Sequence, residues 1–93
     1  MPRPRQCRRI RFRPQAHYFK PQGIPLRTLE VIELSLEEAE AIRLKYVLEL
    51  DQVTAAQRMK TSQSTFQRIL STALKKIAGA LIRGQAIKII SEK

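Results

Sequence analysis

The sequence is poor in several residue types. Its 93 residues include one cysteine, three glycines and no tryptophan. Because Cys7 has no second cysteine to pair with, a disulfide within the chain is excluded and a reducing compartment is favoured. No apolar run approaches the ~20 residues of a transmembrane helix, and no apolar stretch follows the basic N-terminus as in a secretory signal. The sequence therefore predicts a soluble, cytoplasmic protein.

Acidic residues are also scarce. Eight Asp and Glu stand against eighteen Lys and Arg, which gives a formal net charge of +10. Such a charge on a small chain indicates an anionic partner, usually nucleic acid and otherwise a membrane surface. The excess is segregated, because residues 1–34 and 60–93 are strongly basic and residues 35–59 are mildly acidic. This segregation favours one face on a phosphate backbone.

No pattern of catalytic residues is present. Cys7 and His17 are the single cysteine and the single histidine, too few for a metal site of the usual kind. Glu37, Glu38 and Glu40 fit better as capping and solvent-facing residues than as an acid–base pair. A Gly-rich phosphate loop is missing as well. We expect no enzymatic activity, no metal and no cofactor.

The N-terminal third is rich in arginine and irregular. The stretch MPRPRQCRRIRFRP contains six arginines. Within it, Arg9-Ile10-Arg11-Phe12-Arg13 alternates basic and apolar residues, which predicts a short half-buried strand. Two interpretations remain open for Pro2-Arg3-Pro4-Arg5: an arm that enters the DNA minor groove, or a solvated tail. The later stretch LEVIEL, residues 29–34, fits a second strand or the lead into a helix.

A capping box begins the first predicted helix. The hydroxyl of Ser35 can accept a hydrogen bond from the N–H of Glu38, whose carboxylate can reach back to the N–H of Ser35. Apolar residues then recur at helical spacing, which predicts a helix over about 36–47. Its apolar face consists of Ala39, Ile42, Leu44 and Val47.

Two further helices follow, joined by a turn that has neither glycine nor proline. Asp51 is a suitable N-cap for a short helix over about 52–59, and Ser62 for a long helix over about 63–82. The turn between them is Lys60-Thr61. The apolar stripe of the long helix consists of Phe66, Ile69, Leu70, Ala73, Leu74, Ile77 and Leu81.

So short a turn between two helices predicts a helix-turn-helix, which fixes the second helix so that its N-terminal residues can meet base edges in the major groove. Gln can pair with adenine and Arg with guanine. We expect base contacts from Gln63, Ser64, Gln67 and Arg68. We expect DNA backbone contacts from Arg9, Arg11, Arg13, Gln52, Thr54, Ser62, Thr65, Ser71, Lys75 and Lys76.

The stretch DQVTAAQRMKTSQSTFQRILSTALKKI resembles region four of bacterial sigma factors and related response regulators. Ser62, Phe66, Ile69 and Ala73-Leu74-Lys75-Lys76 match the capped recognition helix of that pattern. The pattern usually has Gly-Val in the turn, where this chain has Lys60-Thr61. Lys60 therefore either takes a positive φ or the turn differs.

A second resemblance covers nearly the whole chain. The stretches MPRPR, YFKPQGIPL, LSLEEAEAIRL, AAQRM, TFQRIL and ALIRGQAI are similar to the uncharacterised protein family 0251 (domain of unknown function 134). This is a family of small prokaryotic predicted DNA-binding proteins. The resemblance implies DNA binding related to transcription.

The C-terminal residues predict a strand and, with it, an assembly. Gly84 fits as the residue that ends the long helix, and Ala86-Ile87-Lys88-Ile89-Ile90 is β-prone. A lone strand must pair, and Arg9-Ile10-Arg11-Phe12-Arg13 is the best partner within the chain. Pairing of Ile87-Lys88-Ile89-Ile90 with Ile10-Arg11-Phe12 of a second copy would instead make a two-fold dimer suited to palindromic DNA.

The expected fold is mainly α, a sigma region four-like helix-turn-helix with a small β element. It divides into a basic arm, strand and loop over 1–34, the helix-turn-helix over 35–84, and a short strand and tail over 85–93. The expected function is sequence-specific binding of double-stranded DNA by a transcriptional regulator. Two alternatives stay open: a protein-binding adaptor of the transcription machinery, with RNA polymerase as a candidate partner, and an RNA-binding protein. The few aromatic residues disfavour single-strand stacking.

Overall fold

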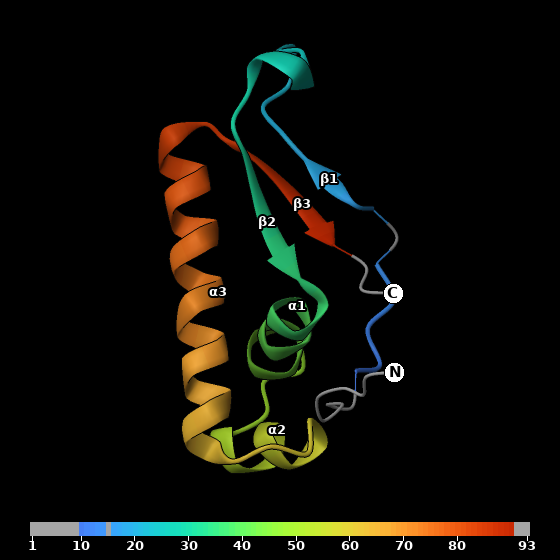
Figure 1. Cartoon of the computed structure of the whole chain (residues 1–93). Coiled ribbons are helices and arrows are strands. Elements are labelled where there is room, and N and C mark those ends of the chain that lie inside the picture. Colours follow the sequence, from blue (N-terminus) through green and yellow to red (C-terminus); the bar gives the residue numbers. More distant parts are fainter. Residues whose placement is uncertain (1–9, 15, 91–93) are drawn as a thin grey trace, which may run out of the picture.

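The computed structural model describes residues 10–14 and 16–90, which form a mainly helical fold with a three-stranded sheet (Figure 1). The mainly α prediction with a small β element is therefore confirmed. In chain order the elements are β1 (Tyr18–Phe19), the 3-10 turn η1 (Leu26–Thr28), β2 (Val31–Ser35), α1 (Leu36–Ile42), the π-helical segment η2 (Arg43–Val47), α2 (Gln52–Arg58), α3 (Gln63–Arg83) and β3 (Ala86–Ile90).

The first predicted helix is present as α1 and η2 in direct succession. Ser35 Oγ accepts a hydrogen bond from the N–H of Glu38 at 3.1 Å, and Glu38 Oε1 accepts one from the N–H of Ser35 at 2.9 Å, which completes the capping box. The last turn is wider, because the N–H of Leu48 donates to the carbonyl of Arg43 at 2.9 Å. Val47 lies within this wider turn and is 69% exposed instead of lying on the predicted apolar face.

Local capping also begins α2 and α3. Asp51 Oδ1 accepts a hydrogen bond from the N–H of Thr54 at 2.7 Å, and this bond lowers the pKa of the Asp51 carboxyl. Ser62 Oγ accepts one from the N–H of Thr65 at 3.1 Å. In the turn between the helices Lys60 has a φ of 58°. Of the two possibilities for this turn, a positive φ at Lys60 is therefore the correct one.

A Lys60→Gly variant is expected to be more stable than the parent chain, by about 0.5–1 kcal/mol. The left-handed conformation costs an L-residue roughly 1–2 kcal/mol, and the greater freedom of glycine in the unfolded chain offsets only part of this gain. Urea unfolding followed by circular dichroism measures the change. Gln57→Gly, at an exposed residue of α2, is the control and is expected to destabilise by about 1 kcal/mol. A destabilised Lys60→Gly variant would contradict the strain argument.

The sheet has the order β1-β3-β2, with β3 in the centre. β3 pairs antiparallel with β1, where Tyr18 faces Lys88, and parallel with β2, where Val31 faces Ala86. The stretch LEVIEL thus supplies a strand that leads directly into α1. Gly84 ends α3 with a φ of 69°, as predicted.

The predicted strand at residues 9–13 is wrong for its described part. Residues 10–13 belong to no strand, and β3 pairs with β1 and β2 instead of with them. Two contacts replace strand pairing: Phe12 packs against a hydrophobic cluster, and the N–H of Arg11 donates to Glu40 Oε2 at 3.3 Å. The alternating pattern therefore marks an extended segment attached to helix α1.

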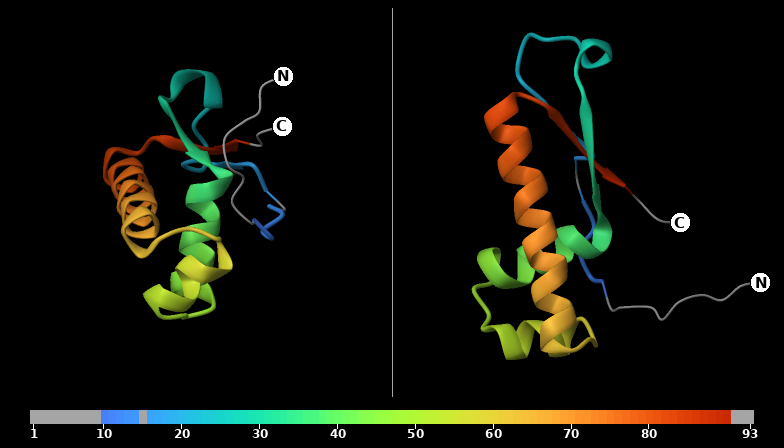
Figure 2. Two further views of the ribbon diagram at one scale, coloured as in Figure 1. Left: turned by 60° about the horizontal axis from the view of Figure 1, so that its bottom comes forward. Right: turned by 60° about the vertical axis from the view of Figure 1, so that its left-hand side comes forward.

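α3 contributes to both hydrophobic clusters. One joins the three helices and consists of Ala41, Leu44, Ala55, Ala56, Met59, Phe66 and Leu70. The other joins the sheet to α1 and α3 and consists of Leu34, Ala39, Ala73 and Ile89. Figure 2 shows the same division, with α2 beside the start of α3 and the sheet beside its later turns. None of the helices within the described residues is long and apolar enough to cross a membrane.

The predicted apolar stripe of α3 is only partly buried. Phe66, Leu70 and Ala73 are buried, whereas Leu74 is partly exposed and Leu81 is 74% exposed. Leu81 lies in the last turns of α3, which extend past α1 and α2 (Figure 1), and the buried residue of these turns is its neighbour Ala80. Helical spacing alone therefore predicted a longer buried stripe on α3 than the structure has.

Candidate nucleic-acid interface

The start of α3 presents polar side chains to solvent. All four predicted base-contacting residues, Gln63, Ser64, Gln67 and Arg68, are exposed. They come from consecutive turns at one end of a single helix, so the fold brings them together on one surface. Phe66 lies among them in the sequence, yet its side chain is fully buried on the opposite side of the helix.

Buried side chains on the opposite side of α3 hold this end of the helix in place. Phe66 and Leu70 pack into the cluster that also contains Met59 of the α2–α3 turn and Leu44 of η2. The aromatic ring therefore fixes the angle of α3 relative to α2. A fixed angle is what allows side chains of a helix end to meet a rigid ligand together.

The N-terminus of α3 is suited to an anion. Ser62, Gln63 and Ser64 are exposed there, and the first turn of the helix contains no acidic residue. The first N–H groups of a helix lack intrahelical acceptors and, with the helix dipole, favour negative charge. Ser62 Oγ also donates to Thr65 Oγ1 at 3.0 Å, so these two predicted backbone-contacting hydroxyls form one pair.

The other predicted backbone-contacting residues fall into two groups. Arg11, Arg13, Ser71 and Lys75 are exposed, whereas Gln52 and Thr54 of α2 are half-buried. Arg9 lies outside the described residues. The exposed residues come from the N-terminal segment and from the side of α3 that faces solvent.

Lys76 differs from its neighbour Lys75. Its ammonium donates to the carbonyl of Glu33 at 2.8 Å and to Glu38 Oε1 at 3.0 Å. These contacts tie α3 to β2 and to the start of α1, so Lys76 serves the fold and its predicted phosphate contact is not supported. Two adjacent lysines point in directions about 100° apart on a helix, and the sequence alone did not separate their roles.

The two lysines are expected to respond differently to alanine. Lys76→Ala removes two hydrogen bonds of a charged group, and we expect it to lower the free energy of unfolding by about 1–2 kcal/mol. Lys75→Ala removes an exposed side chain, and the change is expected to stay within about 0.5 kcal/mol. Urea unfolding of the two variants measures this difference. Equal losses would contradict the assignment of Lys76 to the fold.

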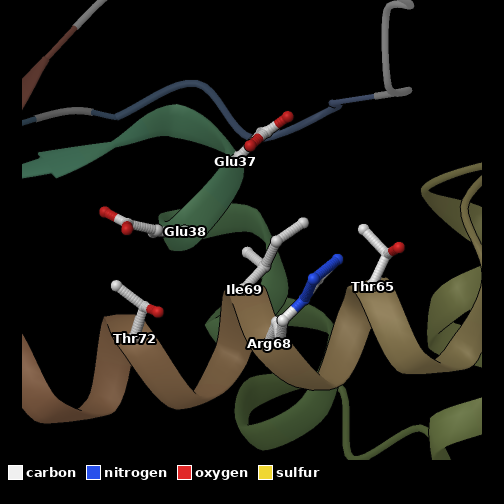
Figure 3. Close-up of a pocket in the computed structure, with 6 residues that line it drawn as sticks. All are labelled: Glu37, Glu38, Thr65, Arg68, Ile69 and Thr72. Carbon is white, nitrogen blue, oxygen red and sulfur yellow. The ribbon is translucent and has the colours of Figure 1, made fainter.

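A hollow of about 270 Å³ lies between the start of α1 and the first half of α3 (Figure 3). Its lining residues are Glu37, Glu38, Thr65, Arg68, Ile69 and Thr72. Figure 3 shows Thr65 and Arg68 projecting from α3 on the side where Glu37 lies. Arg68 lies on the α3 side of the hollow, and the carboxylates of Glu37 and Glu38 lie on its α1 side. They place an acidic border beside the polar helix end, which sequence reasoning missed because it concerns residues far apart in the chain.

Several large apolar side chains elsewhere are exposed. Tyr46, Val47, Leu48 and Val53 lie around the connection from η2 to α2, and Leu81 and Ile82 lie near the end of α3. Within residues 10–14 and 16–90, no group of three His, Cys, Asp or Glu side chains could hold a metal ion.

The fold and this surface define a small, basic, mainly helical protein whose candidate binding site is the exposed polar end of a long helix. The chain belongs to the family described as "Protein of unknown function DUF134", whose family model matches residues 1–92. The family resemblance seen in the sequence is thereby confirmed.

Relatives from several bacteria are similar over almost the whole chain. A UPF0251 protein of Dehalococcoides mccartyi is 54% identical over 89 residues, which cover 96% of this chain and 76% of the relative. A UPF0251 protein of Desulforudis audaxviator is 53% identical over 89 residues, 96% of this chain and 58% of the relative. The chain therefore spans only part of the length of these relatives. No solved structure matches it.

Proposed function

We propose that the protein binds double-stranded DNA sequence-specifically and acts as a transcriptional regulator. In this proposal α2, the turn at Lys60 and α3 form a helix-turn-helix like that of sigma factor region four, and the start of α3 enters the major groove. The observation that carries the proposal is the exposed group Gln63, Ser64, Gln67 and Arg68, on a helix end that buried Phe66 holds in place.

Charge supports this assignment. α3 contains Arg68, Lys75, Lys76 and Arg83 and no acidic residue, and the whole chain has a net charge of +10. A helix of this composition attracts a polyanion and is steered to it over a distance. Amide side chains and arginine at its exposed start can then read hydrogen-bonding groups of base pairs. Binding of this kind requires no catalytic group, so the proposal includes no enzymatic activity.

Selection of bound duplexes from a random pool tests the proposal. We expect one enriched sequence, bound about 10³-fold or more tightly than a scrambled duplex. Binding should weaken steeply as salt is raised, because phosphate contacts release counterions. Equal binding of selected and scrambled duplexes would contradict sequence-specific recognition. Preference for RNA in a parallel selection would instead favour the RNA-binding alternative.

A dimer stays a prediction, but its predicted route is unfavourable. β3 is hydrogen-bonded to β1 on one side and to β2 on the other. Exchange through Ile87-Lys88-Ile89-Ile90 and Ile10-Arg11-Phe12 of a second copy would have to displace one of these strands. A two-fold assembly on palindromic DNA would therefore use another surface.

One observation favours the adaptor alternative. The exposed apolar side chains Tyr46, Val47, Leu48 and Val53 come from one short stretch of the chain, and groups of this kind often mark protein contacts. RNA polymerase is the candidate partner. Salt-dependent duplex binding separates this alternative from the proposed function, because an adaptor without DNA affinity shows none.

A further inference from the structure

Glu40 is a buried acid on α1. Its side chain is 2% exposed, although sequence reasoning placed it among solvent-facing residues. A carboxylate out of contact with water requires hydrogen-bond donors. Arg43 supplies two of them, from Nε to Oε1 at 2.9 Å and from a terminal guanidinium nitrogen to Oε2 at 3.1 Å. These bonds raise the pKa of the Arg43 guanidinium.

A third donor comes from far away in the chain. The backbone N–H of Arg11 donates to Glu40 Oε2 at 3.3 Å. Arg43 is a neighbour on the same helical segment, whereas Arg11 belongs to the N-terminal segment, so the bond from Arg11 joins that segment to α1. It fixes the main chain of Arg11 and leaves the guanidinium of Arg11 free to point outward.

An apolar contact holds the same segment at the next residue. Phe12 packs against the cluster that contains Leu34, Ala39, Ala73 and Ile89. In an extended chain successive side chains point to opposite sides. Phe12 therefore points inward and its neighbours Arg11 and Arg13 are exposed. In the view of Figure 3 the start of α1 lies between this segment, drawn in blue, and α3.

We propose that Glu40 is a positioning residue for DNA binding: it holds Arg11 and Arg13 as a fixed pair of contacts to the DNA backbone. This inference rests on the proposed function. A fixed pair of charges loses less conformational entropy on binding than a free arm does. The pair Glu40–Arg43 is neutral as a whole, so the attachment adds no negative charge to the surface that Arg11 and Arg13 make positive.

The test compares three variants of the full chain and a fourth that combines the first two. Arg11→Ala/Arg13→Ala removes the contacts themselves. Glu40→Gln keeps the shape of the side chain but weakens its bonds to Arg43 and to Arg11. Glu33→Gln, at an exposed acid, is the control for the loss of one negative charge. Two quantities are measured: the salt dependence of binding to the selected duplex, and the rate of tryptic cleavage after Arg11 in the folded protein.

The double arginine variant is expected to reduce the slope of log K against log salt by about two units, one for each phosphate contact. Glu40→Gln is expected to reduce the slope by about one unit and to speed up cleavage after Arg11 about tenfold. When Glu40→Gln is combined with the double arginine variant, the slope should be the same as in the double arginine variant alone. Glu33→Gln should leave the slope and the cleavage rate as in the parent. A purely structural role of Glu40 would change the urea midpoint and leave the slope of the folded protein intact.

Different failures have different meanings. A parental slope and a parental cleavage rate in Glu40→Gln would overturn the positioning role, while the proposed function would stand. A parental slope in the double arginine variant would overturn the backbone contacts as well. Absence of duplex binding by the parent chain would refute the proposed function and this inference together. If Glu40→Gln does not fold, Phe12→Ala releases the same segment at its apolar contact; a reduced slope supports the inference and a parental slope overturns it.

Discussion

Replacement of Phe66 by alanine is expected to lower the free energy of unfolding by about 3–5 kcal/mol. The Phe66 side chain is 0% exposed and lies in the cluster shared by α1, η2, α2 and α3. Its removal leaves a cavity where the helices meet. Since small domains are stable by only about 5–15 kcal/mol, a loss of this size would leave much of the chain unfolded or loosely packed at moderate temperature.

Urea unfolding followed by circular dichroism measures this loss. Phe19→Ala is the matched control, because Phe19 is also a phenylalanine but is 54% exposed on β1. Removal of its ring should cost about 1 kcal/mol or less. Duplex binding by Phe66→Ala should fall with the folded fraction. A variant as stable as the parent would show that Phe66 does not hold α3, and the proposed function would lose its structural basis.

The second large effect is expected on base recognition. Gln67→Ala and Arg68→Ala should each weaken binding to the selected duplex by about 1–3 kcal/mol and relax the preference at one base pair. Both side chains are exposed on α3, so stability should change by less than about 0.5 kcal/mol. Repeated duplex selection with each variant measures which position of the site has lost its preference.

Arg83→Ala is the control for Arg68→Ala. It removes the same charge from the same helix, but from the last turn. Its expected effect is a small loss of affinity with an unchanged selected sequence. If Arg68→Ala behaves like Arg83→Ala, Arg68 contributes charge and reads no base. If Gln67→Ala also leaves affinity and selected sequence unchanged, the assignment of α3 as the recognition helix is wrong.

The features predicted correctly from the sequence depend on short-range chemistry. Ser35, Asp51 and Ser62 each cap a helix through a bond to a residue three positions later. Gly84 ends α3 because glycine adopts the left-handed conformation without strain. Signals of this kind lie within a single turn and do not depend on the rest of the fold. The helices, their boundaries and the exposed polar start of α3 were therefore predictable.

The features missed depend on partners from distant parts of the chain. The alternating pattern around Phe12 fits a strand or an attached extended segment equally well, and the buried carboxylate of Glu40 decides between them. Lys76 is bound by Glu33 and Glu38, which only the packing of α3 against β2 and α1 brings near. The sequence shows where polar residues stand, but it does not identify their hydrogen-bond partners in the fold.

The central place of β3 has a consequence for the order of folding. β1 and β2 precede all three α-helices in the chain, and the strand that joins them follows the last helix. The helices can form through local contacts, whereas the sheet must first close a long loop at an entropic cost. During synthesis, β1 and β2 are complete long before β3 leaves the ribosome. The sheet is therefore expected to form last, and the apolar side chains of β2 stay exposed to other chains until it does.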